Sequence, residues 1–174
     1  MNTLDRLNSL SPDEAETQFL KCCGSKNWAR RMVKQRPFID VSELLSKAGA
    51  SWRSLDEQDW LEAFRSHPKI GEKKADQVQS AEARAWSEQE QAGTLDSAQE
   101  TMAALAAGNR EYESRFGYIF IVCATGKTSA EMLSILRDRL GNDPENELRV
   151  AAEEQRKITQ LRLRKLIAEE GLGS

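Results

Sequence analysis

Apolar residues recur along most of this chain at intervals of three and four residues, which places them on one face of an α-helix. The stretches with this spacing are 12–23, 27–36, 40–49, 56–66, 98–116, 129–140 and 144–171. No internal repeat, low-complexity tract or flexible linker separates them. The pattern therefore predicts an all-α protein in which residues 1–174 form a single compact multi-helix bundle domain.

Side chains that cap helices support several of these beginnings. Ser11 and Glu14 have the spacing of a capping box, and Pro12 stands at the first helical position, where a missing N–H is tolerated. Thr128 and Glu131 repeat the capping-box spacing before an apolar helical stretch. We therefore expect helices to begin directly after Ser11 and Thr128.

The composition is that of an ordinary globular chain, with 39% hydrophobic and 30% charged residues among 174 positions. The formal net charge of -3 gives no general attraction to nucleic acid or anionic lipid, so neither partner is expected. The longest apolar run, YIFIVCA, is too short to cross a bilayer, and the first ten residues lack the apolar stretch of a signal peptide. We therefore expect a cytoplasmic location.

The few cysteines and the single histidine limit the chemistry that the chain can perform. Cys22 and Cys23 are adjacent and Cys123 is distant, so the three cysteines form neither a CxxC pair nor an even disulfide framework. With only one histidine as well, no metal site is expected. Catalysis would then depend on carboxylates, amides, one imidazole and the backbone.

The segment FGYIFIVCATGKT, residues 116–128, resembles a buried strand followed by a nucleotide-binding loop. The phosphate-binding pattern requires a glycine five residues before Gly126, and that position is Ile121. The rest of the chain also lacks the alternating strands and helices of a parallel sheet. Gly126 is therefore interpreted as preceding a helix N-terminus and Lys127 as solvated, with nucleotide binding as an alternative.

His67, the only histidine, stands in SHPKIG between a predicted helix and a proline. The residue before a proline is pushed out of the α region, so helix 56–66 should end here. Pro68 and Gly71 restrict the turn that follows, and an imidazole titrates near neutral pH. His67 is therefore a candidate for proton transfer. The alternative is a structural histidine that interacts with the C-terminus of its own helix.

A second candidate is SEQEQ, residues 87–91, in which Ser87 and Glu90 have capping-box spacing. A capping box normally precedes an apolar helical run, but QAGTLDS follows here. The side chains of Ser87, Glu90 and Gln91 lie within one helical turn of a common point. They form either a helix N-cap or a polar site.

The last helical stretch carries an arginine among its apolar positions. Its apolar stripe passes through Leu148, Ala151, Ile158 and Leu166, and Arg162 falls within that stripe. An arginine on a buried face either extends its charged end to the solvent or finds a partner. In the second case the guanidinium would point into a pocket and could hold a carboxylate.

HPKIG, SEQEQ and RFGYIFIVCATGK, in this order and with helical stretches between them, strongly resemble the 2-oxo-4-hydroxy-4-carboxy-5-ureidoimidazoline (OHCU) decarboxylases. The resemblance extends over nearly the whole chain, from SPDEAETQFL to LRLRKL. It implies an all-α fold, usually a homodimer, that acts without cofactor or metal in the conversion of urate to allantoin. The implied reaction is the decarboxylation of OHCU to (S)-allantoin and carbon dioxide.

The resemblance also implies roles for individual residues. His67 would be the proton-transfer residue, with Pro68 beside the substrate. Ser87, Glu90 and Gln91 match the family's S-x-x-E-Q pattern, with Glu90 assigned to catalysis and the other two to substrate binding. The remaining substrate-binding residues are Ile119, Phe120, Ile121, Val122, Cys123 and Arg162.

For residues 119–123 the resemblance replaces the strand-like interpretation. The segment would be a buried, helix-rich wall of the pocket, and its backbone groups would bind the ureido or ring amides. Two other functions stay open. A non-catalytic helical interaction domain would show no turnover, and an isomerase or hydrolase with the same histidine and glutamate would release no carbon dioxide.

Overall fold

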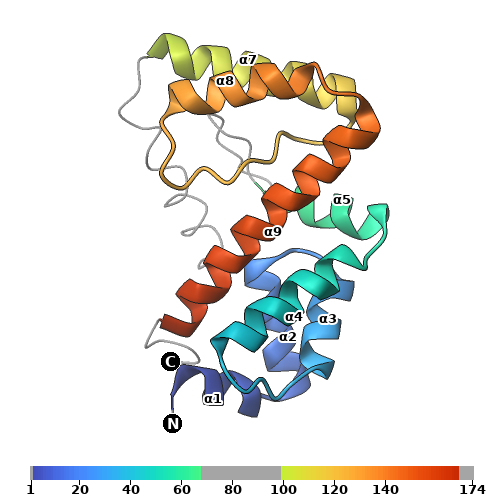
Figure 1. Ribbon diagram of the computed structural model, residues 1–174, viewed down its shortest axis with the longest axis vertical. Coiled ribbons are helices and arrows are strands. Elements are labelled where there is room, and N and C mark those ends of the chain that lie inside the picture. The colour runs from blue at the N-terminus through green and yellow to red at the C-terminus, as the bar shows by residue number, and fades with distance from the viewer. Residues whose placement is uncertain (1, 68–98, 169–174) are drawn as a thin grey trace. The chain divides into compact units, whose positions relative to one another are not determined.

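The computed structural model describes residues 2–67 and 99–168, and every regular element in these two ranges is an α-helix, which confirms the predicted all-α class (Figure 1). The helices are α1 (Thr3–Ser9), α2 (Pro12–Cys22), α3 (Lys26–Lys34), α4 (Val41–Arg53), α5 (Glu57–Arg65), α7 (Gln99–Phe116), α8 (Ser129–Leu140) and α9 (Pro144–Ala168). They belong to two compact units. Met1–Ala63 and Arg156–Ser174 form the first unit, and Phe64–Gln155 forms the second.

Hydroxyl N-caps at the predicted positions begin two of these helices, and the reciprocal capping box is present at Ser11. The Ser11 hydroxyl accepts a hydrogen bond from the Glu14 amide at 3.2 Å, and the Glu14 carboxylate accepts one from the Ser11 amide at 3.0 Å. At α8, the Thr128 hydroxyl accepts from the Glu131 amide at 3.1 Å. A further capping box at Asn2 begins α1, a helix that the hydrophobic pattern did not predict.

In the first unit, aromatic side chains join three helices, because α2 packs against α3 and α3 against α4. Phe19 of α2 meets the Trp28 ring of α3 edge to face, with ring centroids 5.9 Å apart. The Trp28 indole N–H donates a 3.1 Å hydrogen bond to the Ala48 carbonyl of α4, so this buried ring also satisfies its polar atom. Met32 and Leu44 complete the fully buried centre.

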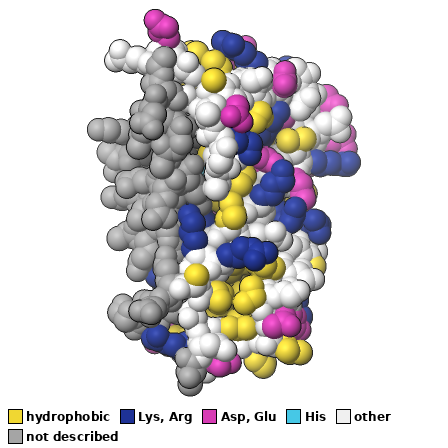
Figure 2. Space-filling view, turned by 60° about the vertical axis from the view of Figure 1, so that its left-hand side comes forward, with side chains coloured by type: hydrophobic (Ala, Val, Ile, Leu, Met, Phe, Trp, Pro, Cys, Tyr) yellow, Lys and Arg dark blue, Asp and Glu magenta, His cyan; other side chains and the backbone are white. Residues whose placement is uncertain are grey.

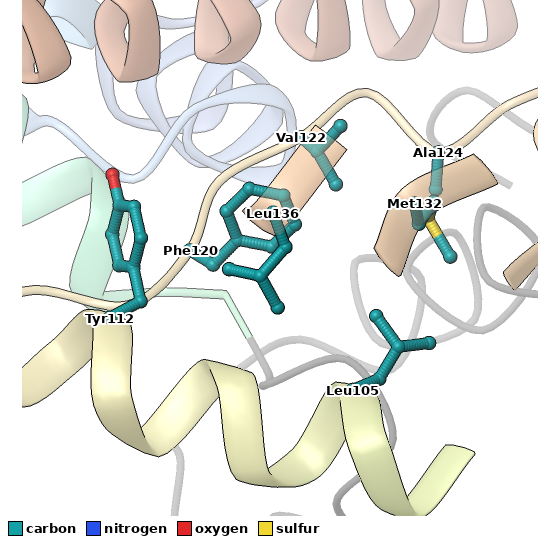
Figure 3. Packing of buried hydrophobic residues seen from close by; sticks show 7 residues of the cluster. All are labelled: Leu105, Tyr112, Phe120, Val122, Ala124, Met132 and Leu136. Atoms are coloured by element: carbon teal, nitrogen blue, oxygen red, sulfur yellow. The ribbon is translucent and has the colours of Figure 1, made fainter. Parts of the chain in front are cut away.

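In the second unit, α7 packs against α8 and the irregular segment 117–128 connects them. Gly108 permits a close approach of the two helices, because a Cβ at this position would lie 2.5 Å from Leu136 Cδ2. Figure 3 shows side chains from both helices and from the connecting segment directed toward one another. The cluster consists of Leu105, Tyr112, Phe120, Val122, Ala124, Met132 and Leu136.

Charged side chains of both signs are interspersed on the surface that Figure 2 colours by type. This distribution agrees with the small formal net charge of -3. Among the residues that the structure describes, no helix is long and apolar enough to span a membrane.

Candidate active site

His67 lies just beyond the end of α5, as its position before a proline predicted. Its backbone N–H donates to the Phe64 carbonyl at 3.2 Å, which fixes the chain as it leaves the helix. His67 is buried, with 7% of the residue's surface exposed. Its Nε2 lies 2.5 Å from Oε1 of Gln155, a fully buried side chain on α9. Both residues belong to the second unit.

Residues 119–123 are buried as predicted, but they form neither a helix nor a strand. Both the helix-rich wall and the earlier strand-like interpretation are therefore wrong for this segment. Phe120 through Cys123 are buried and Ile119 is half-buried. A run of bulky apolar side chains is typical of a buried strand, yet here the run packs against two helices instead of pairing with another strand (Figure 3).

Three backbone groups of this segment are hydrogen-bonded within the second unit. The Ile121 carbonyl accepts from Nη1 of Arg139 at 2.6 Å. The Cys123 amide donates to the Glu154 carboxylate at 3.0 Å, and the Cys123 carbonyl accepts from Lys127 Nζ at 2.8 Å. Buried backbone groups nearly always have hydrogen-bond partners. In this segment side chains provide them, in place of the backbone hydrogen bonds that a neighbouring strand would make.

The other three residues of the segment differ in their backbone hydrogen bonding. Ile119, Phe120 and Val122 make no backbone hydrogen bond to any residue in the described part of the chain. Their amides and carbonyls are therefore the groups of this segment that a bound molecule could use.

A buried ion pair between Arg139 and Glu147 holds the segment 119–123 in place. Arg139 of α8 donates to the Glu147 carboxylate of α9 from Nε at 2.9 Å and from Nη2 at 2.5 Å. The guanidinium also lies over the Phe120 ring, 4.6 Å from its centroid. The Tyr112 hydroxyl donates to the same carboxylate. Burial, and to a smaller extent this hydrogen bond, raises the pKa of Tyr112 well above its ordinary value, so the phenol stays protonated.

In the first unit, Arg162 of α9 is 3% exposed. The buried arrangement that its stripe position allowed is therefore confirmed, and the alternative with a solvent-exposed guanidinium is wrong. The Cys23 thiol lies in the same surroundings, where it bonds to Thr159 and is affected by the charge of Arg162. Burial is the main effect and raises the Cys23 pKa to about 12, so this thiol is not a nucleophile near neutral pH.

Four predicted site residues lie outside the described residues, so the structure does not test their roles. They are Pro68, Ser87, Glu90 and Gln91.

The GKT sequence has a structural explanation in the second unit. Gly126 forms a turn with a φ of +79°, which favours glycine, and Thr128 caps α8. Lys127, which was expected to be solvated, is half-buried, and its Nζ bonds to the Cys123 carbonyl. These contacts use the lysine and the threonine hydroxyl that a phosphate-binding loop would need.

Sequence reasoning missed three polar residues of the second unit, although their spacing was informative. Arg139 lies three residues after the buried Leu136 on α8. Glu147 and Gln155 lie four residues before and after the buried Ala151 on α9. Each therefore occupies an inward-facing position of its helix, the same signal that identified the arginine at 162. In residues 2–67 and 99–168, no group of three potential metal ligands lies together.

The chain is similar to characterised proteins over most of its length. A model of the family described as "OHCU decarboxylase" matches residues 8–164. The chain is 39% identical over 155 residues to the uric acid degradation bifunctional protein TTL of Arabidopsis thaliana, covering 88% of this chain and 48% of that protein. It is 37% identical over 134 residues to the OHCU decarboxylase of Amia calva, covering 76% of this chain and 75% of that protein.

Solved structures give the same result for the fold. The chain aligns with a crystal structure of OHCU decarboxylase in the presence of (S)-allantoin with a TM-score of 0.74 and 35% identity, covering 88% of this chain and 99% of that one. The chain spans about half the length of the Arabidopsis relative and about a third of the bifunctional PucL protein of Bacillus subtilis, to which it is 29% identical.

Proposed function

The chain belongs to the OHCU decarboxylase family, and from this premise we propose that it is a carboxy-lyase that converts OHCU to (S)-allantoin and carbon dioxide without a cofactor. This is the last step in the conversion of urate to allantoin. The names of its relatives support the proposal, because they include both OHCU decarboxylases and uric acid degradation proteins.

The observation that carries this proposal is the environment of His67. The chain has one imidazole, and that imidazole is buried and held by a buried amide instead of being solvated. A buried and oriented imidazole can exchange a proton with a bound molecule near neutral pH.

The chemistry needs little more than orientation and one proton. The bond between the ring carbon and its carboxylate breaks, carbon dioxide leaves, and the electron pair moves into the neighbouring C=N group. The hydroxyl on the former carboxylate-bearing carbon then becomes a carbonyl, and its proton passes to the nitrogen of the former C=N group, which has received the electron pair. A proton adds to one face of the carbon that carries the ureido group, which gives one enantiomer of allantoin. In this proposal His67 provides or directs that proton.

The other predicted residues hold the substrate. Glu90 accepts hydrogen bonds from its hydroxyl or NH groups, Ser87 and Gln91 fix its orientation, and Pro68 packs beside it. Arg162 contacts a carbonyl oxygen of the substrate and not the leaving carboxylate. A contact with the carboxylate would stabilise the ground state more than the transition state and would slow the reaction.

The segment 119–123 forms the apolar wall in this proposal. Its buried side chains lower the hydration of the substrate carboxylate, and the backbone groups of Ile119, Phe120 and Val122 bind the ureido or ring amides. The bonded groups of Ile121 and Cys123 hold the segment in place. Preorganised hydrogen bonds of this kind provide much of the rate enhancement in enzymes.

The first test uses OHCU prepared freshly from urate and follows allantoin by circular dichroism, with wild type and His67→Asn compared. We expect a fast signal of one sign from the wild type and a loss of about 10²- to 10⁴-fold in the variant, the usual contribution of acid–base catalysis. Full activity in the variant would move the chemistry to Glu90. No activity in either folded protein would favour a non-catalytic interaction domain.

Arg162→Lys tests the holding role of the arginine. Lysine keeps the charge but loses the planar, two-pronged hydrogen bonding of guanidinium. A large rise in KM with kcat preserved would support the role, and unchanged kinetics would remove it.

Three further properties are part of the proposal. We propose a homodimer on the basis of the family resemblance, which light scattering on the purified protein tests. We propose a cytoplasmic location, supported by three cysteines that are all free and all buried. We also keep the proposal of one domain, supported by a family match that runs through both units.

A further inference from the structure

Gln155 is a polar side chain in a place where an apolar one would be expected. It lies on the inward face of α9, is 0% exposed, and belongs to the same unit as His67. Burying an amide without hydrogen bonds costs several kcal/mol by order of magnitude, so a buried glutamine normally has specific partners. The structure shows one such partner, Nε2 of His67, at 2.5 Å from the amide oxygen.

The identity of the two atoms determines where the imidazole hydrogen lies. An amide oxygen only accepts hydrogen bonds, so at 2.5 Å the hydrogen must lie on Nε2 and be donated to Gln155. A neutral imidazole carries one hydrogen, so the lone pair is then on Nδ1. The contact therefore selects one of the two tautomers and also fixes the rotation of the ring.

We propose that Gln155 is the positioning residue for His67: it holds the ring in the Nε2–H tautomer and thereby makes Nδ1 the nitrogen that exchanges the reaction proton. The assignment of the tautomer stands on the geometry alone. The assignment of Nδ1 to the reaction also rests on the proposed decarboxylase function. In this role Gln155 acts on the reaction through the imidazole that it contacts.

A neutral partner suits this role better than a carboxylate would. In catalytic triads a carboxylate orients the imidazole and also stabilises its protonated form. Gln155 gives the orientation without adding a negative charge of its own. The neighbouring carboxylate, Glu154, accepts a hydrogen bond from the Cys123 amide. Adjacent residues of α9 thus hold two different parts of the predicted site.

The single histidine makes the tautomer directly measurable. Nitrogen-15 spectra of protein labelled at histidine and carrying no histidine tag contain one imidazole, so no assignment is needed. At a pH where the ring is neutral, we expect the protonated-nitrogen signal on Nε2 and the lone-pair signal on Nδ1. The Nε2 hydrogen should exchange slowly with solvent. The opposite tautomer in the wild type would overturn the proposal, and this measurement needs neither a variant nor a substrate.

Variants then test the link to the reaction. Gln155→Leu should lower kcat by roughly 10- to 10²-fold, less than the roughly 10²- to 10⁴-fold expected when the imidazole itself is removed, with a small change in KM. It should also mix the two tautomers and speed the exchange of the Nε2 hydrogen. Gln155→Glu keeps an acceptor oxygen and should restore the Nε2–H tautomer. Gln160→Leu, on the same helix but without an assigned role, is the matched control and should keep wild-type kcat.

The outcomes separate this inference from the proposed function. Wild-type kcat in a folded Gln155→Leu protein would overturn the positioning role. A wild type with the expected tautomer but no turnover of OHCU would overturn the proposed function and the Nδ1 assignment, while supporting the tautomer assignment.

Discussion

The packing of α2, α3 and α4 in the first unit differs in kind from the packing of α7 and α8 in the second. The first is apolar and aromatic. In α2, α3, α4 and their caps, the buried polar residues are Ser25 and Ser51. The second surrounds an ion pair, Arg139 with Glu147, whose members are 6% and 0% exposed. Both are well buried, so burial alone does not explain why one contains charge.

The difference lies in what each interior has to hold. Apolar packing stabilises helices whose own hydrogen bonds are already made. The second unit must also hold a buried segment without regular secondary structure, and Arg139 supplies the hydrogen bond to its Ile121 carbonyl. A buried ion pair is weak evidence for stability, because desolvation costs as much as attraction gains. Here the ion pair instead fixes the position of the segment 119–123.

The largest effect is expected when the ion pair is broken from one side. Glu147→Leu leaves the Arg139 charge buried without its carboxylate and should lower the free energy of unfolding by about 3–5 kcal/mol. Urea unfolding followed by far-ultraviolet circular dichroism measures the change. Stability equal to the wild type would show that the pair is unimportant to the second unit.

The double variant Arg139→Met, Glu147→Leu sharpens the comparison. It should regain most of the lost stability, because an apolar pair of similar volume replaces both charges. Decarboxylase activity should remain lower by about 10²-fold, since the Ile121 carbonyl has lost its donor and small displacements at a reaction centre are costly. A stable double variant with full activity would mean that apolar contacts alone position the segment.

The second-largest effect belongs to the apolar packing of α2, α3 and α4 in the first unit. Met32→Ala removes a fully buried side chain and should cost about 2–5 kcal/mol, whereas Met32→Leu should cost less than about 1.5 kcal/mol. Activity per folded molecule should stay unchanged for both variants, because this side chain only packs. Urea unfolding and kcat measured together check this, and a kcat that falls with stability would contradict the contrast between the two interiors.

The sequence predicted the helices well because their signals are local. The capping box at Ser11, the N-cap at Thr128 and the proline after His67 act within one or two turns, so they can be read without tertiary contacts. The segment 119–123 could not be predicted in this way. Its apolar run is suited to a strand, and its actual conformation depends on Arg139 and Glu154, which come from two other helices.

The candidate site was predicted unevenly for the same reason. His67 was identified by being unique and by its neighbouring proline, and Arg162 by interrupting an apolar stripe. Gln155 interrupts the same stripe, but a neutral amide is a weaker signal than a charge. Its partner is 88 residues away in sequence, so no local pattern connects the two.

A smaller effect is expected from the helix caps. Ser11→Ala and Thr128→Ala each remove an N-cap hydroxyl and should each lower the free energy of unfolding by about 1 kcal/mol. Only Thr128→Ala should also lower kcat, because this cap is the last residue of the irregular segment 117–128, which contains residues 119–123 of the proposed site. Equal kinetic effects from the two variants, measured beside their unfolding curves, would contradict the assignment of the segment to the site.

The smallest effect concerns the pH dependence of the first unit. The Ile39 amide donates to the Glu43 carboxylate at 2.6 Å and Lys47 Nζ lies 2.9 Å from it, and together they lower the pKa of Glu43, the amide having the larger effect. Because the folded pKa of Glu43 lies below the unfolded one, the stabilisation is present above the unfolded pKa and is lost as pH falls through the folded pKa.

Glu43→Gln should therefore be slightly less stable than wild type at pH 7 and equally stable in acid. Unfolding midpoints measured from pH 7 downward check this. A difference that stayed constant or grew in acid would mean that the shape of the side chain, and not its charge, stabilises the start of α4.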